Sequence, residues 1–351
     1  MDIKALVRES IWNLQGYSSA RHEYDGVADI FLDANENPYQ SEINRYPDPF
    51  QLKLKDRLSE IKHIVPDRIF IGNGSDEAID LIIRIFCEPD KDNIIIFPPT
   101  YGMYKVSADI NNVKTIKSSL TADYQINTSD ALSKINAHTK VAFICSPNNP
   151  TGNIMKRSDV LHFIKNFNGI TVIDEAYIDF SDGPGYSDWI DQNPGLIILQ
   201  TLSKAWGAAG IRLGIAMSNE VVIGLLNKVK PPYNVNSLSQ QRALEVLSDE
   251  ADFNARVNQI KRERERVAES LLSMELVRKV HPSEANFLLV EMDRAAQLFR
   301  YLREKGVVIR DRTRTHLCND CLRITIGLPQ ENDRLLEEIG IFDNQESANK
   351  P

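Results

Sequence analysis

The chain has 351 residues, of which 42% are hydrophobic and 26% are charged, and its formal net charge is -8. These totals are ordinary for a soluble globular protein of about two domains, and the negative charge argues against non-specific nucleic-acid binding, which needs a cationic surface. No stretch approaches the roughly 18 uninterrupted apolar residues of a membrane helix, and the acidic, amphipathic N-terminal segment is unlike a signal peptide.

Short apolar runs bounded by turn residues alternate along the chain with amphipathic helical stretches. The predicted strands include residues 93–97, 141–145, 170–173 and 196–199, and the predicted helices include residues 75–86 and 159–167. Because these strands do not alternate in polarity, we expect them to be buried on both faces of a mainly parallel sheet. The sequence therefore predicts a large α/β domain at residues 35–240.

A second, smaller α+β domain is predicted at residues 241–343. Residues 250–274 form one long charged helical stretch, whose mixed charges are typical of a solvated helix face. Residues 285–292, 307–310 and 323–326 follow as predicted strands. We expect residues 1–34 to pack on this small domain and on the active site. The polar residues 344–351 are expected to form a disordered tail.

The four cysteines predict no metal site. Cys87 and Cys145 have apolar neighbours and are expected to be small buried side chains. Cys318 and Cys321 form a single CxxC without a second pair, so we interpret them as structural thiols. Unpaired cysteines indicate a reducing compartment. With the composition, they favour a cytoplasmic protein that has neither a nucleic-acid nor a membrane partner.

The most informative segment is TLSKAWGAAGIRLG at residues 201–214. Lys204 follows a predicted strand in a loop rich in hydroxyls and glycines, and such a lysine can form an imine with an aldehyde cofactor. Thr201, Ser203 and Arg212 could hold an anionic group close by. A lone lysine in a loop is usually a surface charge, so the interpretation depends on the whole string.

Two further strand ends supply groups that suit a pyridine ring. Asp174 ends a predicted strand, where open α/β sheets bind ligands, and a carboxylate there can keep a pyridine nitrogen protonated. Tyr177 could donate a hydrogen bond to the ring's phenolate oxygen. Asn149, in a loop fixed by prolines, could donate to the same oxygen. Taken singly, the aspartate and the asparagine would be ordinary turn residues.

A phosphate cradle and a stacking ring complete the set. Gly74, Ser75 and Asp76 would present backbone N–H groups at a helix N-terminus, a natural phosphate site. Tyr101 follows another strand and could stack on a flat ring. A capped helix without a ligand and a structural aromatic are the alternatives. Together, the loops provide what one phosphorylated pyridine aldehyde needs, and pyridoxal 5'-phosphate (PLP) is such a molecule.

The strings SPNNPTG at residues 146–152, DEAY at 174–177 and TLSKAWGAAGIRLG at 201–214 resemble those of the fold-type I, aspartate aminotransferase-like PLP enzymes. More narrowly, the chain is similar to the histidinol-phosphate aminotransferases among the class II enzymes. That resemblance is carried by GYSSAR at 16–21, DANENP at 33–38, RYPD at 45–48, PPTYGMY at 98–104 and CLRIT at 321–325. It extends over nearly the whole chain and implies a seven-stranded sheet in the large domain.

The resemblance also implies a homodimer with shared active sites. Tyr46 would reach the cofactor phosphate of the neighbouring subunit. Arg323 would bind the anionic end of the substrate, with help from Arg310. Tyr17 and Asn35 match family segments that line the substrate site, and Tyr17 belongs to the part that covers the bound substrate.

The implied reaction moves an amino group between L-histidinol phosphate and 2-oxoglutarate, giving imidazole-acetol phosphate and L-glutamate in L-histidine biosynthesis. Lys204 would be the general base and acid, while Asp174 would stabilise charge on the ring. One arginine fork could accept either a carboxylate or a phosphate. The alternatives are a PLP-dependent threonine-phosphate decarboxylase, an aromatic amino acid aminotransferase and, more remotely, a non-catalytic ligand sensor on the same scaffold.

Overall fold

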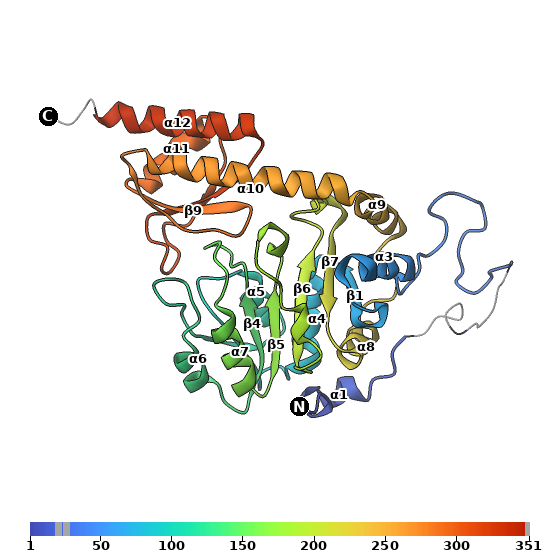
Figure 1. Cartoon of the computed structure of the whole chain (residues 1–351). Helices are drawn as coiled ribbons and strands as arrows, with labels where there is room; N and C mark the ends of the chain where they lie inside the picture. The colour runs from blue at the N-terminus through green and yellow to red at the C-terminus, as the bar shows by residue number, and fades with distance from the viewer. Residues whose placement is uncertain (18–22, 24–28, 348–351) are drawn as a thin grey trace.

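The computed structural model describes residues 1–17, 23 and 29–347 (Figure 1). Its helices are α1 (Glu9–Trp12), α3 (Leu52–Lys62), α4 (Ser75–Phe86), α5 (Met103–Ile110), α6 (Thr128–Lys134), α7 (Arg157–Asn166), α8 (Glu220–Val229), α9 (Ser237–Leu247), α10 (Glu250–Leu272), α11 (Ala295–Glu304) and α12 (Pro329–Ser347). Its strands are β1 (Ile69–Asn73), β2 (Asn93–Ile96), β3 (Lys114–Lys117), β4 (Thr139–Cys145), β5 (Ile170–Asp174), β6 (Leu196–Thr201), β7 (Leu213–Met217), β8 (Val277–Val280), β9 (Phe287–Met292), β10 (Arg310–Asp311) and β11 (Cys321–Thr325). Within the described ranges no helix is long and apolar enough to cross a membrane.

The large domain is built on a seven-stranded sheet in the order β1-β7-β6-β5-β4-β2-β3. The pairs from β6 through β5, β4 and β2 to β3 are parallel, whereas β7 runs antiparallel to both of its neighbours. The predicted mainly parallel seven-stranded α/β fold is therefore confirmed. The parallel strands end at one edge of the sheet, so the loops that follow them lie together.

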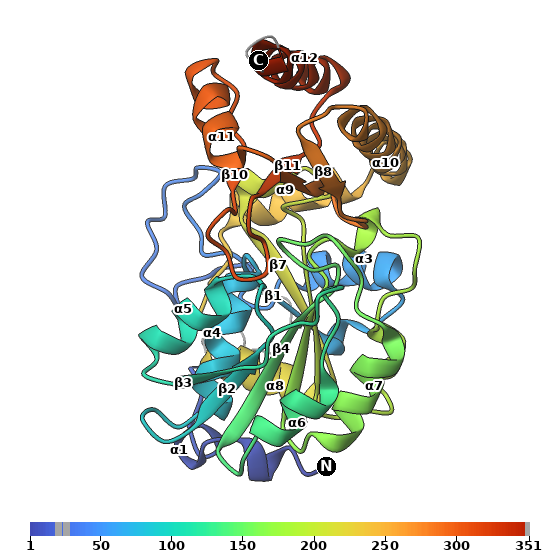
Figure 2. The same cartoon turned by 90° about the vertical axis from the view of Figure 1, so that its left-hand side faces the viewer.

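Each face of the large sheet is covered by helices, which explains the unbroken apolar strands (Figure 2). In β4, Phe143 and Cys145 point into one core with α4, α5 and α8. Ala142 and Ile144 point into a second core with α3, α6, α7 and α9. A strand buried on both faces gains burial energy from every residue, so alternation in polarity is lost.

The small domain holds a four-stranded antiparallel sheet in the order β10-β11-β9-β8, packed against α10, α11 and α12. Helix α10 runs from the large domain into the small one (Figure 1), with Val257 in a core beside Tyr177 and Leu271 in the core of the small domain. The charged run in α10 is not wholly solvated, contrary to expectation. Arg264 is buried and donates to the carbonyl oxygen of Ala285 at 2.9 Å, which ties the helix to the strand entering the small domain.

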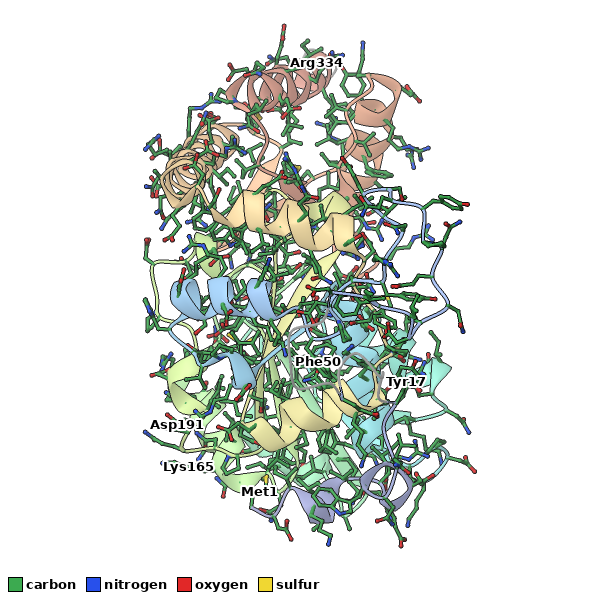
Figure 3. The ribbon with its side chains drawn as sticks, turned by 90° about the vertical axis from the view of Figure 1, so that its right-hand side faces the viewer. Met1, Tyr17, Phe50, Lys165, Asp191 and Arg334 are labelled. Atoms are coloured by element: carbon green, nitrogen blue, oxygen red, sulfur yellow. The ribbon has the colours of Figure 1, made fainter. Side chains whose placement is uncertain are left out.

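The N-terminal segment does not pack on the small domain, so that prediction is wrong for residues 1–12. Ile3 and Val7 are buried in the core that α4 and α8 form under the large sheet. The N–H of Arg8 donates to the carbonyl oxygen of Ile85 at 3.0 Å. Figure 3 shows Met1 at one end of the molecule and Arg334, on α12, at the other. Ile3 and Val7 are four residues apart, so they lie on one face of the segment, and this apolar face packs against the core of the large domain.

The predicted domain limits also need correction. The boundary at 240 falls inside α9, whose Ala243 and Leu247 pack in the core with α3 and α7, and the chain passes into the small domain only along α10. Residues 344–347, expected to be disordered, continue α12 to Ser347, because Phe342 anchors that helix on the small-domain core. The remaining tail, 348–351, and residues 18–21 of the GYSSAR string lie outside the described residues. The strand expected at 307–310 begins only at Arg310.

Candidate active site

A cavity of about 510 Å³ lies at the carboxyl edge of the large sheet, under the β10–β11 edge of the small domain. Most of the predicted site residues line it: Gly74, Ser75, Asp76, Tyr101, Asn149, Asp174, Tyr177, Thr201, Ser203, Lys204, Arg212, Arg310 and Arg323. Most of them come from the ends of the large-sheet strands and the segments that follow, which the sheet order gathers at one edge, whereas Arg310 and Arg323 come from β10 and β11 of the small domain. The cavity is large enough for a cofactor-sized molecule.

Asp174 ends β5 and is buried at the floor of the cavity. Its carboxylate accepts a hydrogen bond from the Tyr104 hydroxyl at 2.6 Å and another from the N–H of Ala176 at 3.1 Å. Burial raises the pKa of Asp174, and the Tyr104 hydrogen bond opposes that shift. A buried carboxylate of this kind favours a positively charged partner such as a protonated ring nitrogen.

Tyr104 is a residue that sequence reasoning missed as part of the site. It lies in α5, is fully buried, and stacks on Phe143 of β4 with ring centroids 4.8 Å apart. The only available signal was its place in the PPTYGMY string, one turn after Tyr101. A periodic apolar helix face predicts that the ring is buried, but it does not predict which carboxylate accepts the hydrogen bond of its hydroxyl.

Lys204 occupies the turn after β6, and its Nζ lies 5.6 Å from the centre of the Tyr177 ring. Burial lowers the pKa of Lys204, and the charge of Arg323 lowers it further, while Asp174 opposes the shift. The turn is fixed by Thr201, whose Oγ1 accepts the N–H of Ser203 at 3.1 Å. The amine is thus more readily deprotonated than an exposed lysine, as a nucleophile or base requires.

Two loops interlock to form an anion cradle at the start of α4. Gly74, with φ of 74°, precedes the helix and donates its N–H to the carbonyl oxygen of Arg212 at 2.8 Å. A Cβ at Gly214 would come within 2.0 Å of the backbone nitrogen of Ser75, so only glycine permits this approach. The helix N-terminus and the Arg212 guanidinium together favour a phosphate group.

Asp76 and Tyr101 close one side of that cradle. The Tyr101 hydroxyl donates to Asp76 Oδ1 at 3.1 Å, and Arg212 forms a long ion pair with Asp76 at 3.9 Å. Burial raises the pKa of Tyr101, with the Asp76 carboxylate adding to the shift. Its ring also meets Tyr104 edge-on at 5.5 Å between centroids, so it is held in place at the cavity wall.

A hydrogen-bonded chain links the middle of the cavity to the small domain. Arg323 donates to Asn149 Oδ1, and Asn149 Nδ2 donates to the Tyr177 hydroxyl at 3.3 Å. Burial raises the pKa of Tyr177, so its hydroxyl keeps its proton and remains a donor. Arg323 therefore fixes the direction of the Asn149 amide, with its N–H side turned to Tyr177.

Three arginines gather where the small domain meets the cavity: Arg310, Arg312 and Arg323. Arg310 lies directly opposite Arg323 in the antiparallel β10–β11 pair, an arrangement of like charges that destabilises a sheet. Within the described part of the chain, none of the three forms an ion pair with a carboxylate. An anionic ligand would supply the missing charge.

Arg312 is the second residue that sequence reasoning missed. Its position two residues after Arg310 was the available signal, since alternate residues of an extended strand face the same side. The predicted strand ended at 310, so that alternation was not followed further.

Three predicted residues do not reach this cavity. Tyr46 is half exposed and stacks on Tyr233 with centroids 4.5 Å apart. Tyr46 and Asn35 line a separate cavity of about 490 Å³. Tyr17 is 70% exposed and lies on the surface seen in Figure 3. Within this chain, then, these residues are apart from Lys204 and Asp174.

The donors and acceptors of the cavity fit PLP. The cradle at Gly74 and Arg212 suits its phosphate, the Asp174 carboxylate suits its ring nitrogen, and Asn149 with Tyr177 suits its ring oxygen. Lys204 supplies the amine that an aldehyde requires. All of these residues already line the cavity, so the fit requires no rearrangement of the described loops.

Comparison with known proteins agrees with this fit. Residues 22–339 match the family model described as aminotransferase class I and II. A histidinol-phosphate aminotransferase of Parabacteroides distasonis is 52% identical over 335 residues, covering 95% of this chain and 97% of its own. The crystal structure of the histidinol-phosphate aminotransferase from Clostridium acetobutylicum superposes with a TM-score of 0.79 at 26% identity, covering 86% of this chain and 92% of its own. The enzyme from Sinorhizobium meliloti, solved in complex with PLP, shares the fold with a TM-score of 0.77 at 21% identity, covering 86% and 83%.

Proposed function

Because the chain belongs to the class I and II aminotransferases, which use PLP, we propose that it transfers the amino group of L-histidinol phosphate to 2-oxoglutarate. The products are imidazole-acetol phosphate and L-glutamate, and the reaction is a step of L-histidine biosynthesis. The observation that carries the proposal is one cavity that joins a PLP-compatible set of residues to an arginine cluster. Relatives of nearly the same length that bear the name of this enzyme support it.

The arginine cluster explains how one site could serve both substrates. Histidinol phosphate carries a phosphomonoester where glutamate carries its α-carboxylate. A guanidinium fork accepts two oxygens of either group. We assign Arg323 as the main contact, because it is anchored to Asn149, and Arg310 as its neighbour across the strand pair.

When bound, PLP supplies an electron sink that lets the carbon bearing the amino group release a proton. Gly74, Ser75 and Arg212 would hold its phosphate, and Asp174 would hold its ring nitrogen. Lys204 Nζ would hold the aldehyde carbon, and the same amine would be the base that takes the proton from the substrate carbon. The lowered pKa of Lys204, caused first by burial, favours the neutral amine that this use as a base requires.

The test is a half-reaction without keto acid. Mixing the PLP-loaded protein with L-histidinol phosphate should bleach the visible absorbance of the lysine-bound cofactor, and 2-oxoglutarate should restore it. If the absorbance stays unchanged with histidinol phosphate but responds to an aromatic amino acid, the substrate assignment is wrong. Release of carbon dioxide from threonine phosphate would instead indicate the decarboxylase.

We also propose a homodimer with shared active sites. Residues 29–47 leave the body of the chain as an extended arm (Figure 1), and several of its large apolar side chains are exposed, among them Leu32 at 89%. Monomers rarely leave such surface uncovered. An arm that packs on a second copy would bury these side chains and could bring Tyr46 to the partner's cofactor phosphate.

Mixed dimers can test this arrangement. Tyr46→Ala and Lys204→Ala proteins, each impaired alone, would form hybrids in which one site carries both changes and the other carries neither. We expect activity to return when the two proteins are mixed and exchanged. Verified hybrids that stay as inactive as their parents would exclude shared sites.

The cytoplasmic location is a further proposal. All four cysteines are unpaired and buried. Such cysteines are usual in a reducing compartment, where disulfides are rare. Fractionation of cells, with the activity followed through the fractions, would check the location.

A further inference from the structure

Arg312 stands directly after β10, in register with the strand pair that forms the roof of the cavity. Its N–H donates to the carbonyl oxygen of Cys321 at 3.0 Å, so the pairing of β10 with β11 continues one residue past the strand. Residues two apart on an extended strand face the same side. Arg312 therefore shares its face with Arg310, and both line the cavity with Arg323.

The position of Arg312 is unfavourable unless an anion is present. Its Nε is buried and has no hydrogen-bond partner among the described residues, and the same holds for Nε of Arg323. Burial lowers the pKa of Arg312, and the charges of Arg323 and Arg310 lower it further. A half-buried cation beside two others, with its Nε buried and unpaired among the described residues, costs free energy that an ordinary structural role does not recover.

The two proposed substrates differ in the charge that they bring to this end of the cavity. A carboxylate carries one negative charge on two oxygens, whereas a phosphomonoester carries a charge of about -1.5 to -2 at pH 7 on three oxygens. Two guanidinium groups are enough to surround a carboxylate. A third donor matches the additional oxygen and charge of the phosphate.

We propose that Arg312 is a specificity-determining residue that favours the phosphomonoester substrate over the amino acid substrate at the shared anion site. Arg323 and Arg310 serve both anions, and Arg312 adds a contact that only the phosphate uses fully. The inference rests on the proposed function for the identity of the substrate. The preference for phosphate as an anion rests on the arginine geometry alone.

The first experiment compares Arg312→Gln with Arg314→Gln. The second variant is a matched control, since Arg314 is an exposed arginine two residues further on that does not line the cavity. For Arg312→Gln we expect kcat/KM for histidinol phosphate to fall about 10- to 100-fold, mostly through KM, as for a lost charge-assisted hydrogen bond. The loss for glutamate should be several-fold smaller, and Arg314→Gln should match the wild type.

Thermal unfolding of the same variants separates binding from structure. If Arg312 serves the ligand, its removal relieves repulsion, so Arg312→Gln should have a Tm equal to or above that of the wild type. Equal losses of kcat/KM for both substrates, or a lowered Tm with no change of preference, would overturn the proposal.

A second readout keeps this inference distinct from the proposed function. Inorganic phosphate is tested as a competitive inhibitor against glutamate in the PLP-loaded protein, where the cofactor's own phosphate site is filled. The inhibition constant should rise about tenfold in Arg312→Gln and stay unchanged in Arg314→Gln. If the wild-type protein does not react with histidinol phosphate, the substrate assignment is wrong. If the inhibition constant of phosphate is the same in Arg312→Gln as in the wild type, the proposed role of Arg312 is wrong.

Discussion

The two ends of the cavity are built on opposite principles. At the end formed by the large domain, polar groups are already paired within the protein: Asp174 with Tyr104, and Asn149 with Tyr177. At the end formed by the small domain, three arginines lie together without a carboxylate partner in the described part of the chain. The large-domain end is therefore organised before any ligand binds. The small-domain end lacks a counter-charge until an anionic ligand binds.

This difference assigns distinct tasks to the two domains. A preorganised polar environment can stabilise charge without rearrangement, so the large-domain end suits a permanently bound cofactor. A cluster of like charges is stabilised only when an anion binds, so the small-domain end suits a substrate that binds and dissociates in each turnover. Arg323 connects the two, because it lines the cavity beside Arg310 and Arg312 and also holds the Asn149 amide.

The largest expected effect is at the large-domain end. Lys204→Ala should abolish the visible absorbance of the lysine-bound cofactor and lower turnover at least about a thousandfold for every substrate, since both the amine and the base are lost. Absorbance spectra and single-turnover assays measure this. The control is Lys230→Met, because burial also lowers the pKa of Lys230, to about 8, but this lysine does not line the cavity. Retained absorbance in Lys204→Ala would mean that another lysine binds the cofactor.

An intermediate effect is expected where the two ends meet. Arg323→Lys keeps the charge but loses the planar fork, so kcat/KM should fall about 10- to 100-fold for both histidinol phosphate and glutamate. Steady-state kinetics with each substrate measures the two losses. Arg312→Gln provides the contrast, since its losses should be unequal. If the kinetics of Arg323→Lys are unchanged for both substrates, Arg323 is not part of the anion site.

The smallest effect is expected behind the large-domain end, where Glu175 turns away from the cavity. Its buried carboxyl accepts hydrogen bonds from Gln200 Nε2 at 2.8 Å and from the N–H of Tyr186. Burial raises the pKa of Glu175 to about 7. The folded state therefore binds a proton between about pH 4.5 and pH 7 that the unfolded state has released. This contribution to stability is complete below that range and is lost as the pH rises through 7.

Glu175→Gln should remove this part of the pH dependence while leaving activity close to that of the wild type. The new amide can be accommodated, because Gln200 Oε1 is buried and has no hydrogen-bond partner among the described residues. It would accept the new N–H after the Gln200 amide rotates by a half turn. Chemical denaturation from pH 5 to pH 8 should show wild-type stability falling by about 3 kcal/mol at most, and a flatter curve for the variant. Parallel curves for the two proteins would show that Glu175 does not titrate in this range.

Much of the fold could be predicted because it is written in local patterns. Helix α4 has the bounds expected from its sequence, and the central strands differ from expectation by a residue or two at their ends. These segments owe their structure to apolar runs and turn residues that the chain carries locally. Strands β3 and β8 were missed, since their exposed and half-buried residues carry no apolar run.

The site divides in the same way. Lys204, Asp174 and Asn149 were predictable because each follows a recognisable strand, and strand ends in a parallel sheet converge at one edge. The pairing of Tyr104 with Asp174 was not predictable, nor was the union of Arg312 with Arg310 and Arg323. Each of those contacts joins surfaces whose meeting depends on packing and register between distant segments.

The sequence by itself thus determined most of the elements, the residue types at the strand ends and the family to which the chain belongs. The tertiary structure decided which groups are neighbours. The N-terminal residues pack on the large domain, and Arg264 is a buried residue of the charged helix α10. The physical reason is that local propensity acts over a few residues, whereas burial and electrostatic pairing depend on surfaces that come together only in the folded chain.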